Sequence, residues 1–498
     1  MYYTGKMRKT LQTLLFSVII SVLLIAHTAM LIYSPFTNIL SHSLVHQRKF
    51  ISLLNKTEKT SDDFEYIQRS LALVQKQWST LSTLIKMLSK TLPLKNLVTY
   101  ADSISSVSSQ LPELLGNKYE AHYVLFFYNN YELRPGGGFI GSLGFITFKN
   151  YTLTKFEVQD VYEIDGQIRD HHEPHSIVRK YLNQPNEYLR DSNFSPDFSQ
   201  NVKNALRYLE SVPPYNRDYI GAIGVTTSAF EDLLRLTGPI ELSDFQTTIS
   251  SSNFFAITQK KIETNFFPGS KQKRSILAAL GNAVRHKLEE LPPFVLIKFI
   301  YRSITSKNLV LYFQNRELQA AMSNLQASGD QKFYYPDWIL PVDTNVGVNK
   351  LNEIVHKTLN LQLIQSNDSV IHSFRSTYSN PISSDAPNKE TFKNYLQLYL
   401  PKNITLIRAR LNNQEVTNEI VTTRVDNKTI FGLYFETPPA SSTSVTIEYR
   451  LPLVGLLSQI EVKKQLGAGT PLVTVVYSRG ETKIIKKVLE SDEVFTLR

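Results

Sequence analysis

The chain has 498 residues, of which 42% are hydrophobic and 20% charged, proportions typical of a folded protein of two to four domains. It contains no cysteine, which excludes disulfides, thiolate metal sites and cysteine nucleophiles. Lys and Arg exceed Asp and Glu by 54 − 44 = 10 without forming an arginine-rich block. This charge favours an anionic membrane or wall surface, or an anionic substrate, as partner, and no nucleic acid is expected.

An apolar run follows the short N-terminal tail, residues 1–10. Residues 11–33 include no Asp, Glu, Lys or Arg, and at about 1.5 Å per residue they are long enough to cross a bilayer as a helix. Lys6, Arg8 and Lys9 place the N-terminus in the cytoplasm and the bulk of the chain outside. A cleaved signal peptide is the alternative, but the run is long and no A-x-A site closes it. The sequence therefore predicts a single-pass protein of the cytoplasmic membrane.

Residues 38–115 have a helical pattern. Apolar side chains from Ile67 to Leu92 alternate spacings of four and three residues, the 3.5-residue period of a coiled-coil-like seam. Pro93 interrupts the stripe, and a similar stripe continues from Leu97 to Leu115. We expect a helical hairpin that serves as a stalk, packs on the next domain or contacts partners.

Strand-like and helix-like segments alternate over residues 119–365, which predicts an α/β domain with helices covering a sheet. Strands are expected at 123–128, 143–149, 153–161, 219–225 and 309–313, and helices at 199–211, 227–236, 271–290, 315–327 and 349–360. Short strand-like segments with polar turns then predict a β-sandwich over residues 370–498.

A glycine-rich turn lies between the first two expected strands. Gly136, Gly137 and Gly138 allow positive φ angles and a close approach of the backbone to a ligand. Arg134 adds a permanent cation with a fork of donors. A glycine-rich hairpin without any ligand is the commoner outcome of such a pattern, so both interpretations stay open.

Around this turn the chain resembles bacterial envelope proteins grouped as domain of unknown function 4012. Residues 129–142, NNYELRPGGGFIGS, are similar to that family's N-N-x-E-L-R-P-x-G-G-F-[IP]-G-S. Three further segments resemble its D-G-Q, R-D-x-N-[WF]-S-P-D-F and V-D-x-N-x-G-x-N-K blocks: 165–167, 190–198 and 343–350, the last with Val348 where the family has Gly. The resemblance covers about residues 1–450 and implies an architecture and a location, without an activity.

A more distant resemblance is to the LytR–CpsA–Psr phosphotransferases, which link polymers carried on undecaprenyl phosphate to peptidoglycan. Segments 217–225, 230–234 and 237–240 fall at a spacing similar to that family's middle region, and 271–275 looks like its R-x-x-R-Q helix. The resemblance implies a mixed sheet with helices and phosphotransferase-like chemistry. That family's metal-binding Asp is replaced near Ser142, which puts the chemistry in question.

These residues suggest a candidate anion site, because a pyrophosphate needs fixed donors and positive charge. Its expected members are Arg134, Gly136, Gly137, Gly138, Ser142, Arg190, Lys271 and Arg274. Asp165, Asp191 and Asp197 are candidate oxygen ligands for Mg²⁺. The alternative is that Arg190, Asp191 and their neighbours form structural ion pairs and loop caps.

A second cluster of metal-ligand types contains His171, His172, Glu173 and His175. Imidazoles and a carboxylate can bind zinc, but the segment includes a proline and reads as an exposed loop, so no metal is assigned to it. No catalytic residue is assigned either.

Two functions remain open. The first is an envelope enzyme or carrier that binds or transfers a glycan linked to polyprenyl (pyro)phosphate. The second is a non-catalytic scaffold or adhesion protein that binds wall polymer, such as peptidoglycan, or protein partners. Convergence of Arg134, Arg190 and Arg274 in one pocket would favour the first.

Overall fold

The computed structural model describes residues 58–92, 94–257, 293–383, 389–453 and 455–497, with a few isolated positions at 49–56 and 279–291. The predicted membrane span at 11–33, Lys271 and Arg274 lie outside these residues, as does most of the helix expected at 271–290. Within the described ranges no helix is both long and apolar enough to cross a membrane.

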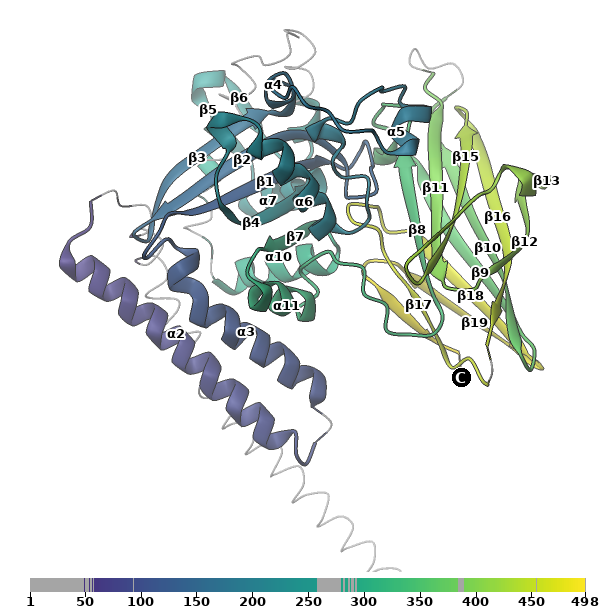
Figure 1. Cartoon of the computed structure of the whole chain (residues 1–498), viewed down its shortest axis with the longest axis horizontal. Coiled ribbons are helices and arrows are strands. Elements are labelled where there is room, and N and C mark those ends of the chain that lie inside the picture. The colour runs from purple at the N-terminus through teal and green to yellow at the C-terminus, as the bar shows by residue number, and fades with distance from the viewer. Residues whose placement is uncertain are drawn as a thin grey trace, which may run out of the picture.

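The first described elements are two long helices that lie side by side, α2 (Ser61–Leu88) and α3 (Lys95–Leu114) (Figure 1). Thr60 begins α2 with a capping box, in which its hydroxyl accepts from the Asp63 N–H and the Asp63 carboxylate accepts from the Thr60 N–H at 2.9 Å. The helical prediction is confirmed over both segments.

A five-stranded sheet in the order β3-β2-β1-β4-β7 follows, and it makes this part a mixed α/β domain. Strands β1 and β4 are parallel, whereas the other pairs are antiparallel. The strands are β1 (Ala121–Asn129), β2 (Phe139–Lys149), β3 (Thr152–Asp160), β4 (Tyr219–Thr226) and β7 (Leu309–Phe313). All five strands expected in this domain are confirmed.

Helices connect and cover these strands. The long ones are α6 (Phe198–Glu210), α7 (Thr227–Thr237), α10 (Pro293–Thr305) and α11 (Arg316–Asn324), and the short elements are α4 (Val161–Asp165), α5 (Ser176–Tyr181), β5 (Ile240–Leu242) and β6 (Thr247–Ile249). Asp197 caps α6, and the buried face of α6 packs against Val124, Phe126 and Tyr128 of β1. This packing fixes the loop that precedes α6.

The C-terminal part consists of β-rich sheets. A seven-stranded sheet has the order β13-β12-β16-β10-β9-β18-β19 and a six-stranded sheet the order β14-β15-β11-β8-β17-β20. Alternate residues of both sheets meet in one hydrophobic core, so the sheets pack face to face. Their strands are β8 (Trp338–Asn345), β9 (His356–Gln365), β10 (Ser369–Asn380), β11 (Phe392–Pro401), β12 (Thr405–Leu411), β13 (Gln414–Glu415), β14 (Val421–Val425), β15 (Lys428–Thr437), β16 (Ser441–Pro452), β17 (Gln459–Val462), β18 (Leu472–Arg479), β19 (Glu481–Val488) and β20 (Glu493–Thr496).

The prediction of a helix at 349–360 is wrong. A single 3₁₀ turn, Leu351–Glu353, occupies its start, and β9 begins at His356. Leu359, Leu361 and Leu363 alternate with exposed polar residues and point into the two-sheet core, a period of two that belongs to a strand. The two sheets therefore include β8 and β9, which precede residue 370.

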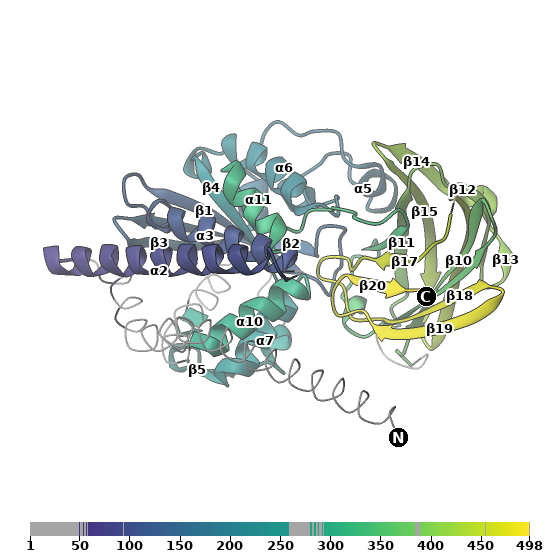
Figure 2. The same ribbon diagram turned by 90° about the horizontal axis from the view of Figure 1, so that it is seen from below.

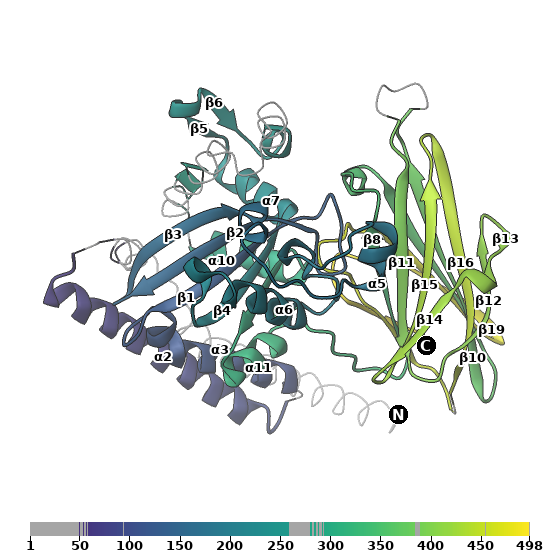
Figure 3. The same ribbon diagram turned by 45° about the horizontal axis from the view of Figure 1, so that its top comes forward.

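The α/β domain and the two-sheet part lie side by side (Figures 1 and 2). The six-stranded sheet faces α5 and α6, whereas β10, β12, β16 and β19 lie on the far side (Figure 3). One face of the six-stranded sheet is thus available to form a site with the α/β domain.

Candidate functional site

The glycine turn after β1 is engaged by protein groups. The Gly136 N–H donates to the Asn193 carbonyl at 2.9 Å, and the Gly137 N–H donates to the Arg134 carbonyl at 3.0 Å. The Asn193 amide nitrogen donates in turn to the Gly138 carbonyl at 2.6 Å. Two of the three N–H groups expected to bind an anion are therefore already used.

Close packing explains why this turn contains glycines. A Cβ atom at Gly137 would lie 2.0 Å from the Leu466 side chain, and one at Gly138 would lie 2.4 Å from the Asn129 carbonyl oxygen. Both glycines have positive φ angles, 121° and 149°. The turn is filled by the segment after β17, so it joins the α/β domain to the two-sheet part.

Arg134 is buried, with 2% of its surface exposed. One guanidinium nitrogen lies 2.7 Å from a Glu132 carboxylate oxygen, and another donates to the Asn345 carbonyl at the end of β8. The Gln465 amide nitrogen donates to the carbonyls of Arg134 at 3.0 Å and Asp343 at 2.8 Å. These contacts hold Arg134 inside the junction between the two parts, so the structure does not favour it as a ligand for a solvent-borne anion.

Arg190 also forms a structural pair. Its guanidinium lies 2.7 Å from the Asp165 carboxylate and 3.9 Å from the centre of the Tyr188 ring. The other Asp165 oxygen accepts from the Leu189 N–H at 2.8 Å. Burial raises the pKa of Asp165 and the Arg190 charge opposes this rise. These contacts favour the alternative of ion pairs and loop caps.

The other candidate ligands are dispersed. Asp197 accepts from the Gln200 N–H at 3.2 Å as the cap of α6, and Ser142 is buried on β2. No group of three or more His, Asp or Glu side chains that could hold a metal ion occurs in the part of the chain that the structure describes. His171 contacts the Glu187 carbonyl at 3.2 Å, and His175 caps α5.

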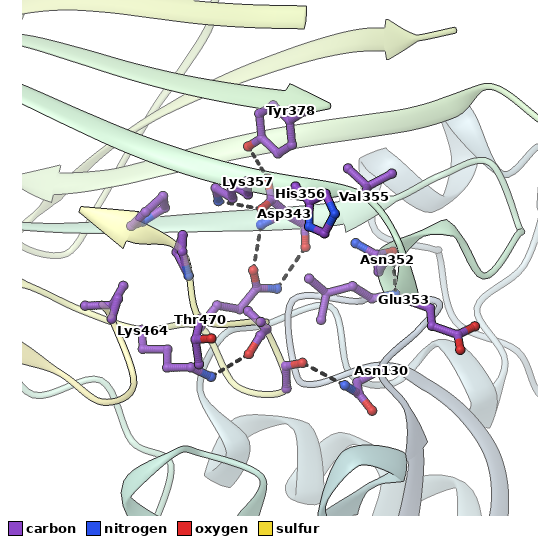
Figure 4. A pocket seen from close by; sticks show the side chains of 18 of the residues that line it. Asn130, Asp343, Asn352, Glu353, Val355, His356, Lys357, Tyr378, Lys464 and Thr470 are labelled. Carbon is purple, nitrogen blue, oxygen red and sulfur yellow. Dashed lines mark hydrogen bonds and ion pairs between the residues drawn. The ribbon is translucent and has the colours of Figure 1, made fainter. Parts of the chain in front are cut away.

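One pocket lies in the junction itself and has a volume of about 330 Å³ (Figure 4). Its central carboxylate, Asp343, accepts from Tyr378 at 2.6 Å, Asn394 at 2.8 Å and Lys357 at 2.5 Å. Burial lowers the pKa of Lys464 to about 7, and its amine donates to two carbonyls at 2.9 and 2.5 Å. Asp343 and Lys464 are thus satisfied by groups of the protein itself, which is the pattern of a structural junction.

A larger cleft of about 950 Å³ lies between α6 and the outer face of the six-stranded sheet. Tyr395, Gln397 and Tyr399 of β11 form part of the sheet wall, because the intervening leucines point into the two-sheet core. The opposite wall is the loop from Asp191 to Asp197 together with the first turns of α6. The segment with the R-D-x-N-F-S-P-D-F pattern thus lines this cleft.

Four buried polar atoms in the cleft walls have no hydrogen-bond partner among the described residues. They are Asp191 Oδ2, Ser192 Oγ, Gln331 Oε1 and Gln397 Oε1. Leaving such an atom unpaired costs about 1–3 kcal/mol, so natural proteins rarely do so without a reason. The four residues that carry these atoms all line the cleft, so its walls are rich in polar side chains.

Two carboxyl groups in the cleft have raised pKa values. Burial raises the pKa of Glu187 to about 7, and the nearby Asp191 charge adds to the rise. Burial raises the pKa of Asp191 to about 6, although Arg134 and Arg190 oppose it. Near neutral pH these groups can both donate and accept hydrogen bonds. Lys203, Arg207 and Lys428 add positive charge to the lining of the same cleft.

The raised pKa of Glu187 predicts a pH-dependent stability. Below about pH 4.5, its usual pKa, Glu187 is protonated in both folded and unfolded chains. As the pH rises to about 7, the unfolded chain releases this proton first, so the folded chain is progressively destabilised. Between these pH values the free energy of unfolding of the parent should fall by roughly 1–2 kcal/mol because of this group, after allowance for solvent screening.

Glu187→Gln should lack this loss, so its unfolding midpoint should exceed the parent's at pH 8 and match it at pH 5. Glu490→Gln, at an exposed position, is the matched control and should follow the parent at both pH values. Equal pH profiles for all three chains would contradict the raised pKa.

The sequence did not predict this cleft, although two residues of one wall were among the predicted site residues. Asp191 and Asp197 are predicted as metal ligands, whereas Glu187, Gln331 and Gln397 are not predicted as site residues and line the same cleft. The sequence does contain an indication for Gln397, because a polar residue inside the apolar run YLQLYL is unusual. The sequence contains no such indication for Gln331, since this residue lies in an irregular segment before β8.

Residues 119–262 match the model of a protein family described as protein of unknown function, DUF4012. This stretch is a DUF4012 domain. It contains the glycine turn, the Asp165 segment and the loop at 190–198, whereas the segment at 343–350 lies beyond it. The DUF4012 domain thus supplies one wall of the cleft, and the two-sheet part supplies the other.

No curated protein matches the chain. Among solved structures, it is similar to a Legionella pneumophila protein described as nutrient-binding, with 7% identity, 25% of this chain covered and a TM-score of 0.19. It is also similar to an M1 zinc metallopeptidase from Deinococcus radiodurans, with 10% identity, 27% of this chain covered and a TM-score of 0.15. For yeast LTA4 hydrolase the identity is 6%, the covered share of this chain is 28% and the TM-score is 0.14. The chain covers 50%, 38% and 27% of those three structures, respectively. Similarities of this size carry no argument about function.

Proposed function

We propose that the chain is an extracytoplasmic protein of the cell envelope, anchored by residues 11–33, that binds a glycan in the cleft between α6 and the six-stranded sheet. The observation that carries this proposal is a cleft of about 950 Å³ whose lining combines the polar side chains of Asp191, Ser192, Gln331 and Gln397 with aromatic rings. A hydroxyl-rich ligand can donate to the glutamine and carboxylate oxygens and accept from the serine hydroxyl.

The rest of the lining suits the same class of ligand. Tyr395, Tyr399 and Phe333 add apolar ring surface beside the amide groups of Gln397 and Gln331. Binding sites combine such apolar surface with a few polar groups that fix the orientation of the ligand. A glycan, which has apolar ring faces and hydroxyl edges, fits this combination.

A glycan carried on polyprenyl phosphate or pyrophosphate is compatible with the cations of the cleft. Lys203 and Arg207 are exposed on α6, and Lys428 lies 5.6 Å from the centre of the Phe333 ring. These three side chains offer a phosphate more accessible positive charge than Arg134 and Arg190, which are held in ion pairs. We therefore favour a binding role over phosphotransferase-like chemistry.

The binding test uses the two glutamines. A Gln331→Ala/Gln397→Ala variant should bind its glycan roughly 30-fold more weakly, because two neutral hydrogen bonds of about 1 kcal/mol each are lost. Calorimetric titration with soluble envelope glycans and with detergent-solubilised polyprenyl-phosphate glycans would measure the affinities of both chains.

The matched control is Gln362→Ala, which removes an exposed glutamine from β9 and should bind like the parent. Absence of binding by the parent to every glycan tested would contradict the proposal, as would equal affinities for the double variant and the control.

A further inference from the structure

The closed end of the helical hairpin has exposed apolar side chains. We define the hairpin tip as residues 86–92 and 94–97, where α2 ends and α3 begins. Met87, Leu92 and Leu97 have 61%, 49% and 50% of their surfaces exposed. Large apolar side chains that gather in this way at one end of an element mark a contact site more often than isolated ones do.

The hairpin tip is also cationic. It contains Lys86, Lys90 and Lys95, and the sequence has no Asp or Glu between Glu65 and Asp102. Lys86 lies 2.7 Å from the Asp102 carboxylate, whereas the described part of the chain has no ion pair at Lys90 or Lys95, both of which are exposed. The partner of this tip should therefore be negatively charged and partly apolar.

The hairpin tip projects from the body of the protein (Figure 1). The packing of α3 against α11 involves Ser103, which accepts from Asn324 at 3.2 Å, and Val107. Leu97 lies six residues before Ser103, which is about 9 Å further along the helix axis. The apolar side chains of the tip therefore lie beyond this contact.

We propose that the hairpin tip docks on the anionic lipid surface of the membrane that holds the chain, an inference that rests on the proposed anchor. Exposed Leu and Met side chains enter the boundary between headgroups and acyl chains, and lysines bind anionic headgroups. The length of the connection permits this geometry. Lys49 and Leu53 are helical, and Leu53 packs with Ile67 near the start of α2. The connection that remains is residues 34–48, which can reach over at most about 50 Å, whereas the 28 residues of α2 span about 42 Å.

The cysteine-free sequence provides a direct test on the full chain. Leu92→Cys places a fluorescent label at the hairpin tip, and Asn360→Cys places the same label at an exposed position on β9. Both chains are reconstituted into phosphatidylglycerol-containing vesicles that carry nitroxide-labelled lipids. The label at position 92 should be quenched, and the label at 360 should not.

Charge removal gives the second arm of the test. In the Leu92→Cys background, Lys90→Gln/Lys95→Gln should lower the ratio of docked to undocked tips about 25-fold, since each lysine near an anionic surface contributes roughly a factor of five. Vesicles of phosphatidylcholine alone should give the same loss of quenching.

Flotation of the vesicles separates this inference from the anchor on which it rests. A chain that floats with its vesicles while the label at 92 stays unquenched overturns tip docking and leaves the anchor in place. A chain that does not float overturns both. Quenching that is equal on charged and neutral vesicles overturns the role of the lysines.

Discussion

Arg134→Met should lower the free energy of unfolding by about 3–5 kcal/mol, because it leaves the buried Glu132 carboxylate without its partner. Burial already raises the pKa of Glu132, and Arg134 opposes this rise. Without the arginine, the carboxyl should therefore bind a proton more readily. The deficit should shrink as the pH is lowered toward about 5, since a neutral carboxyl is less costly to bury. Denaturant unfolding at several pH values measures both effects.

A double variant tests whether the pair itself is responsible. Glu132→Gln/Arg134→Met removes both charges and should recover a large part of the lost free energy of unfolding. If the two residues acted independently, the losses of the two single variants would simply add. If Arg134→Met unfolded like the parent and lost only affinity for inorganic pyrophosphate, Arg134 would be an anion ligand after all.

A second large effect is expected for Gly138→Ala, which should lower the free energy of unfolding by about 3–5 kcal/mol. Its φ of 149° is one that residues with a side chain rarely adopt, and the new Cβ atom would lie 2.4 Å from the Asn129 carbonyl oxygen. Because that neighbour is backbone, it cannot move aside as a flexible side chain would. Thermal unfolding should show a clearly lowered midpoint.

Gly469→Ala is the matched control, since this exposed glycine has no atom within 4 Å of the position of a Cβ atom. It should change the free energy of unfolding by less than about 0.5 kcal/mol. A Gly138→Ala chain that is as stable as this control would show that the turn does not need its glycines for packing, and a ligand at the turn would again be the better explanation.

The two outcomes bear on how the glycine turn should be interpreted. From the sequence, three glycines beside an arginine fit either a ligand loop or a packed hairpin. Leu466 decides for packing, because it fills the space over Gly137 from more than 300 positions away in the sequence. Gln465 likewise comes from far along the chain, and its amide nitrogen donates hydrogen bonds to the backbone carbonyls of Arg134 and Asp343.

The candidate site was predictable only where it follows local chain chemistry. The loop from Asp191 to Asp197 was identifiable because an acidic, Pro-containing segment precedes a helix and supplies its cap. Gln397 faces the cleft only because β11 pairs between β8 and β15 and directs its leucines into the two-sheet core. Glu187 acquires its raised pKa through burial, which depends on packing.

By itself the sequence determined the five strands of the α/β domain, the helical hairpin and the β-rich character of the C-terminal part. These follow from periodicities of two and about 3.6 residues, which are local properties of the chain. It also determined that no thiol chemistry can occur. Only the tertiary structure decided that Arg134 and Arg190 are held in ion pairs, and that Asp191, Gln331 and Gln397 line one cleft beside α6. Charge pairing and burial depend on distances between segments far apart in sequence, and a single chain's local pattern contains no record of those distances.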